Sequence, residues 1–244
     1  GIDGAVRAQA VPLELPALAN PTAIVVTHAS QGGFGEGRAG MLYRDLVPCR
    51  LGGAFIASAI RIPKGGPVPD YVHFHLVKFQ MIYCIAGWVR LVYEEQGEPF
   101  LLHAGDLVLQ PPTIRHRVLE SSDGLEVLEL SVPAEHVTRA DSHCKLPDTG
   151  ACASEPKRAR TRSYELGKRT FGGQRFCRYQ ATSSLNRAAD TSMEGGLEWH
   201  STGISEATSN LAAVLVGHKT SSPTENTLAG SVKQEADICF GRIN

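Results

Sequence analysis

The sequence lacks long apolar runs, a regular cysteine framework and an excess of charge of one sign. No apolar stretch approaches the roughly 18–20 residues of a transmembrane helix, so no membrane span is predicted. The 24 Lys and Arg residues are balanced by 25 Asp and Glu residues, which argues against a nucleic-acid surface or a polybasic membrane patch. The six cysteines form no CxxC pair, a usage typical of reduced thiols in a cytoplasmic protein.

Patterns with the period of a helix are also scarce, whereas short apolar runs between turn signals are frequent. Glycine and proline bound most of these runs, as in the segment 63–67 and at Pro111-Pro112. The runs predict strands at 54–62, 79–85, 88–93, 100–103, 107–110, 116–119 and 125–132. Many short strands without intervening helices predict an all-β chain that forms an antiparallel barrel or sandwich.

The pair His73 and His75 is the most informative motif in this strand-rich region. Residues two apart on a strand point to the same face, so both imidazoles can reach one point in space. His116 lies at the start of a later predicted strand and can supply a third imidazole, which would complete a site for a divalent transition metal. The other six histidines have no such spacing and are interpreted as ordinary surface or turn residues.

The stretch from Gly66 to His116 resembles the two conserved motifs of the cupin superfamily. The first motif is matched by Gly66, His73, His75, Gln80 and Gly87, and the second by Gly105, Pro111, Thr113 and His116. Gly66 lies one residue further from the first histidine than is usual, Thr113 stands where glycine is common, and Gln80 replaces a glutamate. The resemblance implies a cupin jelly-roll β-barrel, with His73, His75 and His116 as metal ligands and Gln80 as the fourth.

The second half of the chain contains a weak echo of the first. The segment 41–44 followed by 54–62 is similar to 197–200 followed by 211–219, at an offset of about 156 residues. At this offset the metal-binding positions fall on Ala229, Ser231 and Ala236, and no counterpart of His116 is expected. We therefore predict a metal-binding cupin barrel at 1–140, a linker at 141–168 and a partial second cupin-like β repeat at 169–244. The second repeat is expected to pack on the first domain or on another chain.

The predicted donor set favours particular metals and substrates. Imidazole-rich sites suit Fe(II), Zn, Ni, Mn or Cu, and we expect Fe(II) first because the resemblance includes cupin dioxygenases with three-histidine iron sites. Three neutral imidazoles and the neutral amide of Gln80 leave the metal charge uncompensated, which should attract an anionic or enolisable small molecule. Gln80 is expected to ligate weakly through its carbonyl oxygen, or else to hydrogen-bond the substrate.

Two charged side chains on predicted strands are further catalytic candidates. Arg61 could project toward an anionic substrate at the barrel mouth, with an exposed arginine at the sheet edge as the alternative. In 125–132 each face holds one glutamate, so Glu126 or Glu129 must lie among apolar residues. A glutamate forced inside, which we assign to Glu129, would have a raised pKa and could act as a general base; a salt bridge at the barrel rim is the alternative.

The sequence thus predicts an enzyme that uses a metal to act on a small molecule, most simply an Fe(II)/O2 dioxygenase. The alternatives are non-redox chemistry on the same metal, as in an isomerase, cyclase or lyase, and a module that only binds a small ligand. The alternative to a metal site is a metal-free barrel whose histidines only pack or bind a ligand directly. A homodimer would cover the strand edges that an incomplete second barrel leaves exposed.

Overall fold

The computed structural model describes residues 26–28, 32–147, 167–182, 191–194 and 197–219. Most of the predicted linker and the positions Ala229, Ser231 and Ala236 lie outside these residues. No helix among the described residues is long and apolar enough to cross a membrane.

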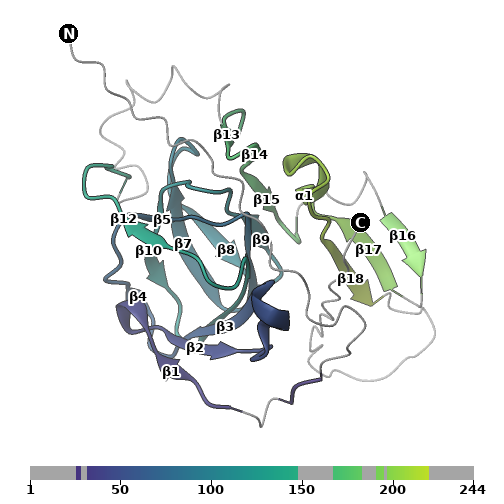
Figure 1. Ribbon diagram of the computed structural model, residues 1–244, viewed down its shortest axis with the longest axis horizontal. Helices are drawn as coiled ribbons and strands as arrows, with labels where there is room; N and C mark the ends of the chain where they lie inside the picture. Colours follow the sequence, from purple (N-terminus) through teal and green to yellow (C-terminus); the bar gives the residue numbers. More distant parts are fainter. Residues whose placement is uncertain (1–25, 29–31, 148–166, 183–190, 195–196, 220–244) are drawn as a thin grey trace.

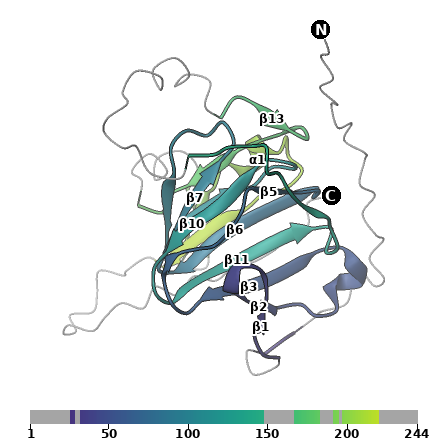
Figure 2. The same ribbon diagram turned by 90° about the vertical axis from the view of Figure 1, so that its left-hand side faces the viewer.

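Two antiparallel sheets face each other and form the barrel (Figure 1). The larger sheet has the order β1-β2-β3-β11-β6-β9-β15, and Figure 2 shows β1, β2, β3, β11 and β6 lying side by side. Its strands are β1 (Gly35–Glu36), β2 (Leu42–Asp45), β3 (Ile56–Ile62), β11 (Leu125–Val132), β6 (Phe79–Ala86), β9 (Leu107–Leu109) and β15 (Cys177–Tyr179). Short 3-10 turns η1 (Arg38–Gly40) and η2 (Arg50–Gly53) join its first strands.

The second sheet has the order β12-β5-β10-β7-β8, with β4 paired to β10. Its strands are β12 (Thr138–Ala140), β5 (His73–His75), β10 (His116–Ser121), β7 (Trp88–Tyr93), β8 (Phe100–His103) and β4 (Gly66–Pro67). Three of the predicted strands, 88–93, 100–103 and 125–132, have the observed bounds, and the others differ at their ends by at most two residues. The prediction of an all-β jelly-roll barrel is confirmed.

The barrel interior is an apolar core contributed by both sheets. Ile82 and Cys84 of β6 face Leu91 of β7 and Leu102 of β8, and all four are buried. Alternate residues of β6, including Met81 and Tyr83, point outward and are buried in a second apolar cluster. Both faces of β6 are therefore covered, which explains why its sequence is almost continuously apolar.

The second half of the chain covers that outer face of the barrel. Strand β15 pairs with β9 and so extends the larger sheet. Ile204 of α1 (Ile204–Ala207) and Val216 of β18 (Leu215–Lys219) pack into the cluster that contains Met81 and Tyr83. The small hairpin β13 (Thr170–Phe171) and β14 (Gln174–Arg175) precedes β15. The second half thus packs on the first, which is one of the two arrangements expected from the sequence.

The strand pattern of the second half repeats that of the first. Strands β16 (Thr191–Glu194), β17 (Leu197–Ser201) and β18 form a three-stranded sheet with α1 between β17 and β18, as η2 lies between β2 and β3. Leu42 of β2 and Arg61 of β3 are register partners. An offset of 156 residues places them on Glu198 and Gly217. The observed register partner of Glu198 is His218, one residue from the expected position. Strands β16, β17 and β18 thus resemble β1, β2 and β3 in their order, whereas the second cupin-like repeat and the domain boundaries stay predictions.

Candidate metal centre

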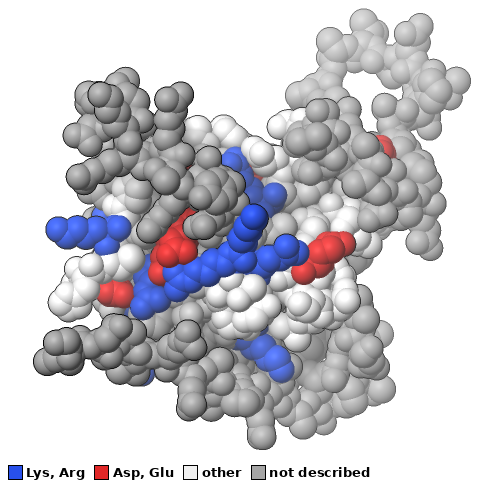
Figure 3. All heavy atoms as spheres, turned by 90° about the horizontal axis from the view of Figure 1, so that it is seen from above, with Lys and Arg blue, Asp and Glu red and all other residues white. Residues whose placement is uncertain are grey.

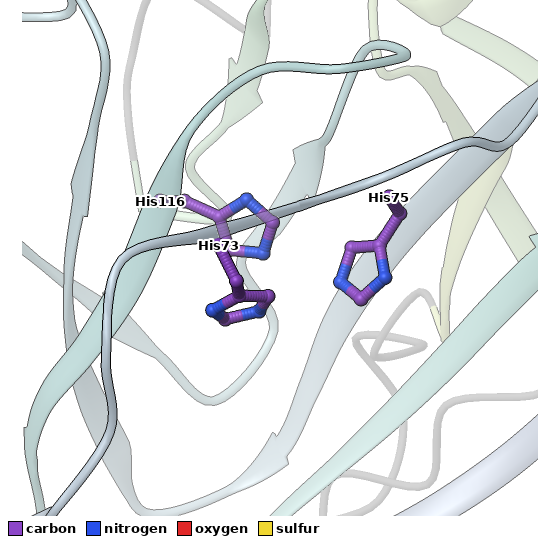
Figure 4. A group of neighbouring side chains, drawn as sticks. All are labelled: His73, His75 and His116. Carbon is purple, nitrogen blue, oxygen red and sulfur yellow. The ribbon is translucent and has the colours of Figure 1, made fainter. Parts of the chain in front are cut away.

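Two adjacent strands of the second sheet bring the three predicted histidines together. His73 and His75 lie two residues apart on β5, and His116 at the start of β10 is the register partner of His73. All three are buried, and their nearest ligand atoms lie within 4.8 Å of one another. Figure 4 shows the three rings around a common space inside the barrel.

Each imidazole is held by a contact to its Nδ1 atom. Nδ1 of His73 donates to the Tyr71 carbonyl oxygen at 2.8 Å, and Nδ1 of His116 donates to the Ile114 carbonyl oxygen at 3.0 Å. Because a carbonyl can only accept, these two rings have their proton on Nδ1 and a lone pair on Nε2. Nδ1 of His75 lies 2.8 Å from Oγ1 of Thr138 on β12. All three contacts orient the rings, and the two carbonyl contacts also fix the tautomer, as is common for metal-binding imidazoles.

Burial keeps all three imidazoles neutral near neutral pH. Burial, and then the positive charge of Arg38, lowers the pKa of His73. Burial and the neighbouring His73 lower the pKa of His75 to about 2, and burial also lowers the pKa of His116 well below its usual value. Neutral imidazoles are the form that binds a metal.

The side chains present fit a divalent transition metal ion. Nε2 of His73 is buried without a hydrogen-bond partner, and a buried polar atom without a partner is costly unless a ligand satisfies it. Three converging neutral nitrogen donors are a set that Fe(II), Ni, Cu or Zn accept.

Gln80 is buried on β6, where it is already hydrogen-bonded. Its Oε1 accepts a bond of 3.0 Å from Nε2 of Gln110, whose Oε1 accepts a bond of 2.5 Å from the Tyr93 hydroxyl. A carbonyl oxygen has a second lone pair, so this chain orients Gln80 without excluding it as a ligand. Its role as the fourth ligand stays a prediction.

The two predicted glutamates occupy opposite faces of β11. Glu129 lines the cavity that contains the histidines, and burial raises the pKa of its carboxyl group. Glu126 points to the outer face and pairs with Arg61 at 2.9 Å. Both sequence interpretations thus occur, the interior carboxyl group at Glu129 and the salt bridge at Glu126.

Arg61 is not brought to the site. It follows Ile60 and precedes Ile62, which line the cavity, so the alternation of β3 turns Arg61 outward, where its side chain is 44% exposed. The Arg61 guanidinium lies over the Phe34 ring in addition to its pairing with Glu126. The observed position matches the alternative of an exposed arginine and corrects the placement of Arg61 at the barrel mouth.

Four side chains near the site, including Gln110, were not singled out from the sequence. Arg38 of η1 and Tyr43 of β2 line the cavity. The ring of His136, interpreted as an ordinary turn residue, lies 5.5 Å from the ring of His75. Only Gln110 had a local signal, since it is a polar residue that ends an apolar strand of the sequence.

No protein-family model matches the sequence, and no curated protein matches it. Solved structures that are similar to the chain include an RmlC-like cupin from Shewanella frigidimarina, with 21% identity, a TM-score of 0.39 and coverage of 46% of this chain and 94% of that one. The polyketide cyclase RemF from Streptomyces resistomycificus has 19% identity and a TM-score of 0.39, with coverage of 48% and 85%. A variant of Bacillus subtilis oxalate decarboxylase has 14% identity and a TM-score of 0.47, with coverage of 78% of this chain and 56% of that one. The chain thus spans about half the length of oxalate decarboxylase. Because these TM-scores lie below 0.5, we infer the chemistry from the site itself.

Proposed function

We propose that this chain, whose first barrel has the cupin fold, is an enzyme that holds one divalent transition metal ion and acts on a small molecule. His73, His75 and His116 would hold the ion through their Nε2 atoms, with Gln80 as a fourth ligand. The single observation that supports this proposal most directly is the buried Nε2 of His73, which has no partner although the ring is fixed by its other nitrogen.

The metal would supply Lewis acidity, and O2 activation if it is iron. The chain supplies the surroundings of the substrate. The cavity of about 60 Å³ is lined mainly by apolar side chains of the barrel core. Such a volume is far below the ~300–1,000 Å³ of pockets for drug-sized ligands, so the substrate is small.

Glu129 is the acid–base candidate of the site. Its carboxyl group lines the same cavity as the three imidazoles, and burial raises its pKa. A carboxyl group with a raised pKa can hold a proton near neutral pH and transfer it to or from a substrate atom in the cavity. If its side-chain oxygen binds the metal ion, Gln80 would position the ion. If it does not, Gln80 would hydrogen-bond and position the substrate.

Two reaction classes fit this arrangement. Oxidative cleavage by Fe(II) and O2 is our first candidate, because three neutral imidazoles are suited to Fe(II). A non-redox isomerase, cyclase or lyase is the second, favoured by the proton-transfer group at Glu129. An anionic or enolisable substrate suits both, since it would compensate the metal charge.

Elemental analysis of freshly purified protein, combined with O2 uptake, tests the proposal. About one equivalent of iron with O2 consumption on addition of a substrate supports the dioxygenase, and zinc, nickel or manganese without O2 consumption supports the non-redox class. Tight ligand binding that survives metal removal would instead indicate a binding module. A protein that takes up no divalent metal when loaded would overturn the proposal.

A further inference from the structure

Arg38 is a cation in the cavity wall with an unused hydrogen-bond donor. Its side chain is only 28% exposed, and it lines the same cavity as the three histidines. The Nη1 atom is buried and has no hydrogen-bond partner. A buried guanidinium donor without a partner costs free energy, and an anionic ligand would recover that cost.

A tight loop between β1 and β2 places Arg38 at the cavity. The loop between β1 and β2 closes with a bond of 2.8 Å from the Gly37 N–H to the Met41 carbonyl oxygen. A Cβ atom on Gly37 would lie only 2.5 Å from the Tyr43 ring, so the loop can lie on that ring only with glycine. Ala39 adopts a left-handed conformation with φ 56°, which turns the chain sharply after Arg38.

Asp70 forms an ion pair with Arg38 but no hydrogen bond to its Nη1 atom. Oδ1 of Asp70 lies 3.8 Å from Nη1 of Arg38, beyond hydrogen-bond distance, and it also has no hydrogen-bond partner. The other carboxylate oxygen of Asp70 accepts a bond of 2.9 Å from the Val118 N–H. Asp70 therefore holds the guanidinium by charge, while the hydrogen-bonding capacity of Nη1 stays unfilled.

The positive charge of Arg38 also acts on the rest of the site. It contributes to the lowered pKa of all three histidines and opposes the raised pKa of Tyr43. A ligand in the cavity would therefore lie between two positive groups, the guanidinium and the metal ion of the proposed function.

We infer that Arg38 is a specificity-determining residue that binds a carboxylate group of a small substrate, while the rest of the substrate reaches toward the three histidines. This inference rests on the proposed function and names its substrate class, a small carboxylic acid. Neutral molecules of the same size would lack the charged partner of Arg38.

The test compares Arg38→Gln with Arg61→Gln, which removes an arginine from the outer face of the same sheet. Zinc content is measured first. Calorimetry then gives the dissociation constants of malonate, acetate and the neutral malonamide, for zinc-loaded and metal-free protein. We expect Arg38→Gln to keep its zinc and to bind malonate about 10- to 100-fold more weakly, since the lost bonds are charge-assisted. Arg61→Gln should bind malonate like the wild type, and malonamide should not distinguish Arg38→Gln from the wild type.

The outcomes separate this inference from the proposed function. Failure of the wild type to take up metal contradicts the proposed function, and the malonate comparison in metal-free protein then still decides the role of Arg38. Equal malonate affinity of Arg38→Gln and the wild type, or no measurable carboxylate binding by the wild type, overturns the inference. If Arg38→Gln does not fold, Arg38→Lys replaces it. This variant keeps the charge but loses the two-donor fork, and it should show a smaller loss of malonate affinity.

Discussion

His73 on β5 and His116 on β10 are register partners in an antiparallel pair, and their ring centroids lie 4.3 Å apart. Neighbouring strands thus bring together two imidazoles separated by 43 positions in the sequence. The third ring, of His75, is 5.1 Å from His73 and 5.2 Å from His116. The backbone pairing of two strands therefore determines the shape of the candidate metal centre.

The first prediction concerns metal content. His75→Ala removes one of three nitrogen donors, so the variant should lose most of its bound metal while the barrel stays folded, because the apolar core does not depend on that ring. His136→Ala is the matched control, since the ring of His136 lies 5.5 Å from that of His75 but belongs to no metal-binding cluster among the described residues. Elemental analysis and circular dichroism check the result. Full metal content in His75→Ala, or equal loss in both variants, would show that the ligand assignment is wrong.

The second prediction concerns the pH dependence of stability of the metal-free protein. Burial raises the pKa of Glu129 in the folded state, so the folded protein binds this proton more tightly than the unfolded chain does. The resulting stabilisation is complete below the unfolded pKa and is lost as the pH rises through the folded pKa. Glu129→Gln cannot ionise, so its unfolding free energy should decrease less than that of the wild type between pH 4 and pH 8.

Urea denaturation of metal-free protein across that range measures this effect. Glu126→Gln is the control, because it removes the other glutamate of β11, which lies on the outer face and does not line the cavity. This variant should still lose stability as the pH rises, because it keeps Glu129. Parallel profiles for the wild type and Glu129→Gln would contradict the assignment of an interior carboxyl group with a raised pKa.

The third prediction concerns the turn before His116. Thr113 has φ 65°, a left-handed conformation that costs a β-branched residue free energy and that glycine adopts readily. The backbone N–H of Thr113 donates to the His75 carbonyl oxygen at 3.0 Å, a bond that glycine would keep. Thr113→Gly should therefore raise the unfolding free energy by about 0.5–1 kcal/mol. As a control, Thr170→Gly on β13 should lower it, since that residue lies in a strand without positive φ. If Thr113→Gly lowers the unfolding free energy, the contacts of the threonine side chain stabilise the fold by more than its left-handed backbone conformation destabilises it.

The sequence predicted the features that depend on local periodicity, and it missed those that depend on distant segments. The His-x-His pair and the strand limits of 88–93, 100–103 and 125–132 follow from alternation and turn residues. Arg38 could not be found in this way, because the loop that contains it belongs to the larger sheet and meets the histidines of the second sheet only across the cavity between the two sheets. The sequence left open whether Arg61 lies at the barrel mouth or on the outside, because alternation says which residues share a face but not which face is interior. That choice is determined by packing: Ile60 and Ile62 line the cavity, whereas Ala57 and Ala59 of the other face are also buried.

The charged surface combines side chains of both signs. Figure 3 shows one face on which a band of Lys and Arg side chains is accompanied by Asp and Glu side chains. Among the described residues, Arg115 pairs with Glu94 and Asp141, and Arg169 pairs with Glu94 and Glu95. These pairs offset the positive charges of Arg115 and Arg169 locally.

The last prediction tests whether the partial second repeat stabilises the barrel. Ile204 of α1 is fully buried in the cluster that contains Met81 and Tyr83 of the barrel strand β6. Ile204→Ala should therefore lower the unfolding free energy of the whole chain by about 2–5 kcal/mol, because it removes buried methyl groups and leaves a cavity. The control is Leu215→Ala on β18, whose side chain is 51% exposed, with an expected change within about 0.5 kcal/mol. Denaturation followed by the fluorescence of Trp88 in the barrel and Trp199 in the second repeat should give one common transition in the wild type, because the two parts share a core. If Ile204→Ala shifts the transition of the second half alone and leaves that of the barrel unchanged, the second half does not stabilise the barrel that contains the three histidines.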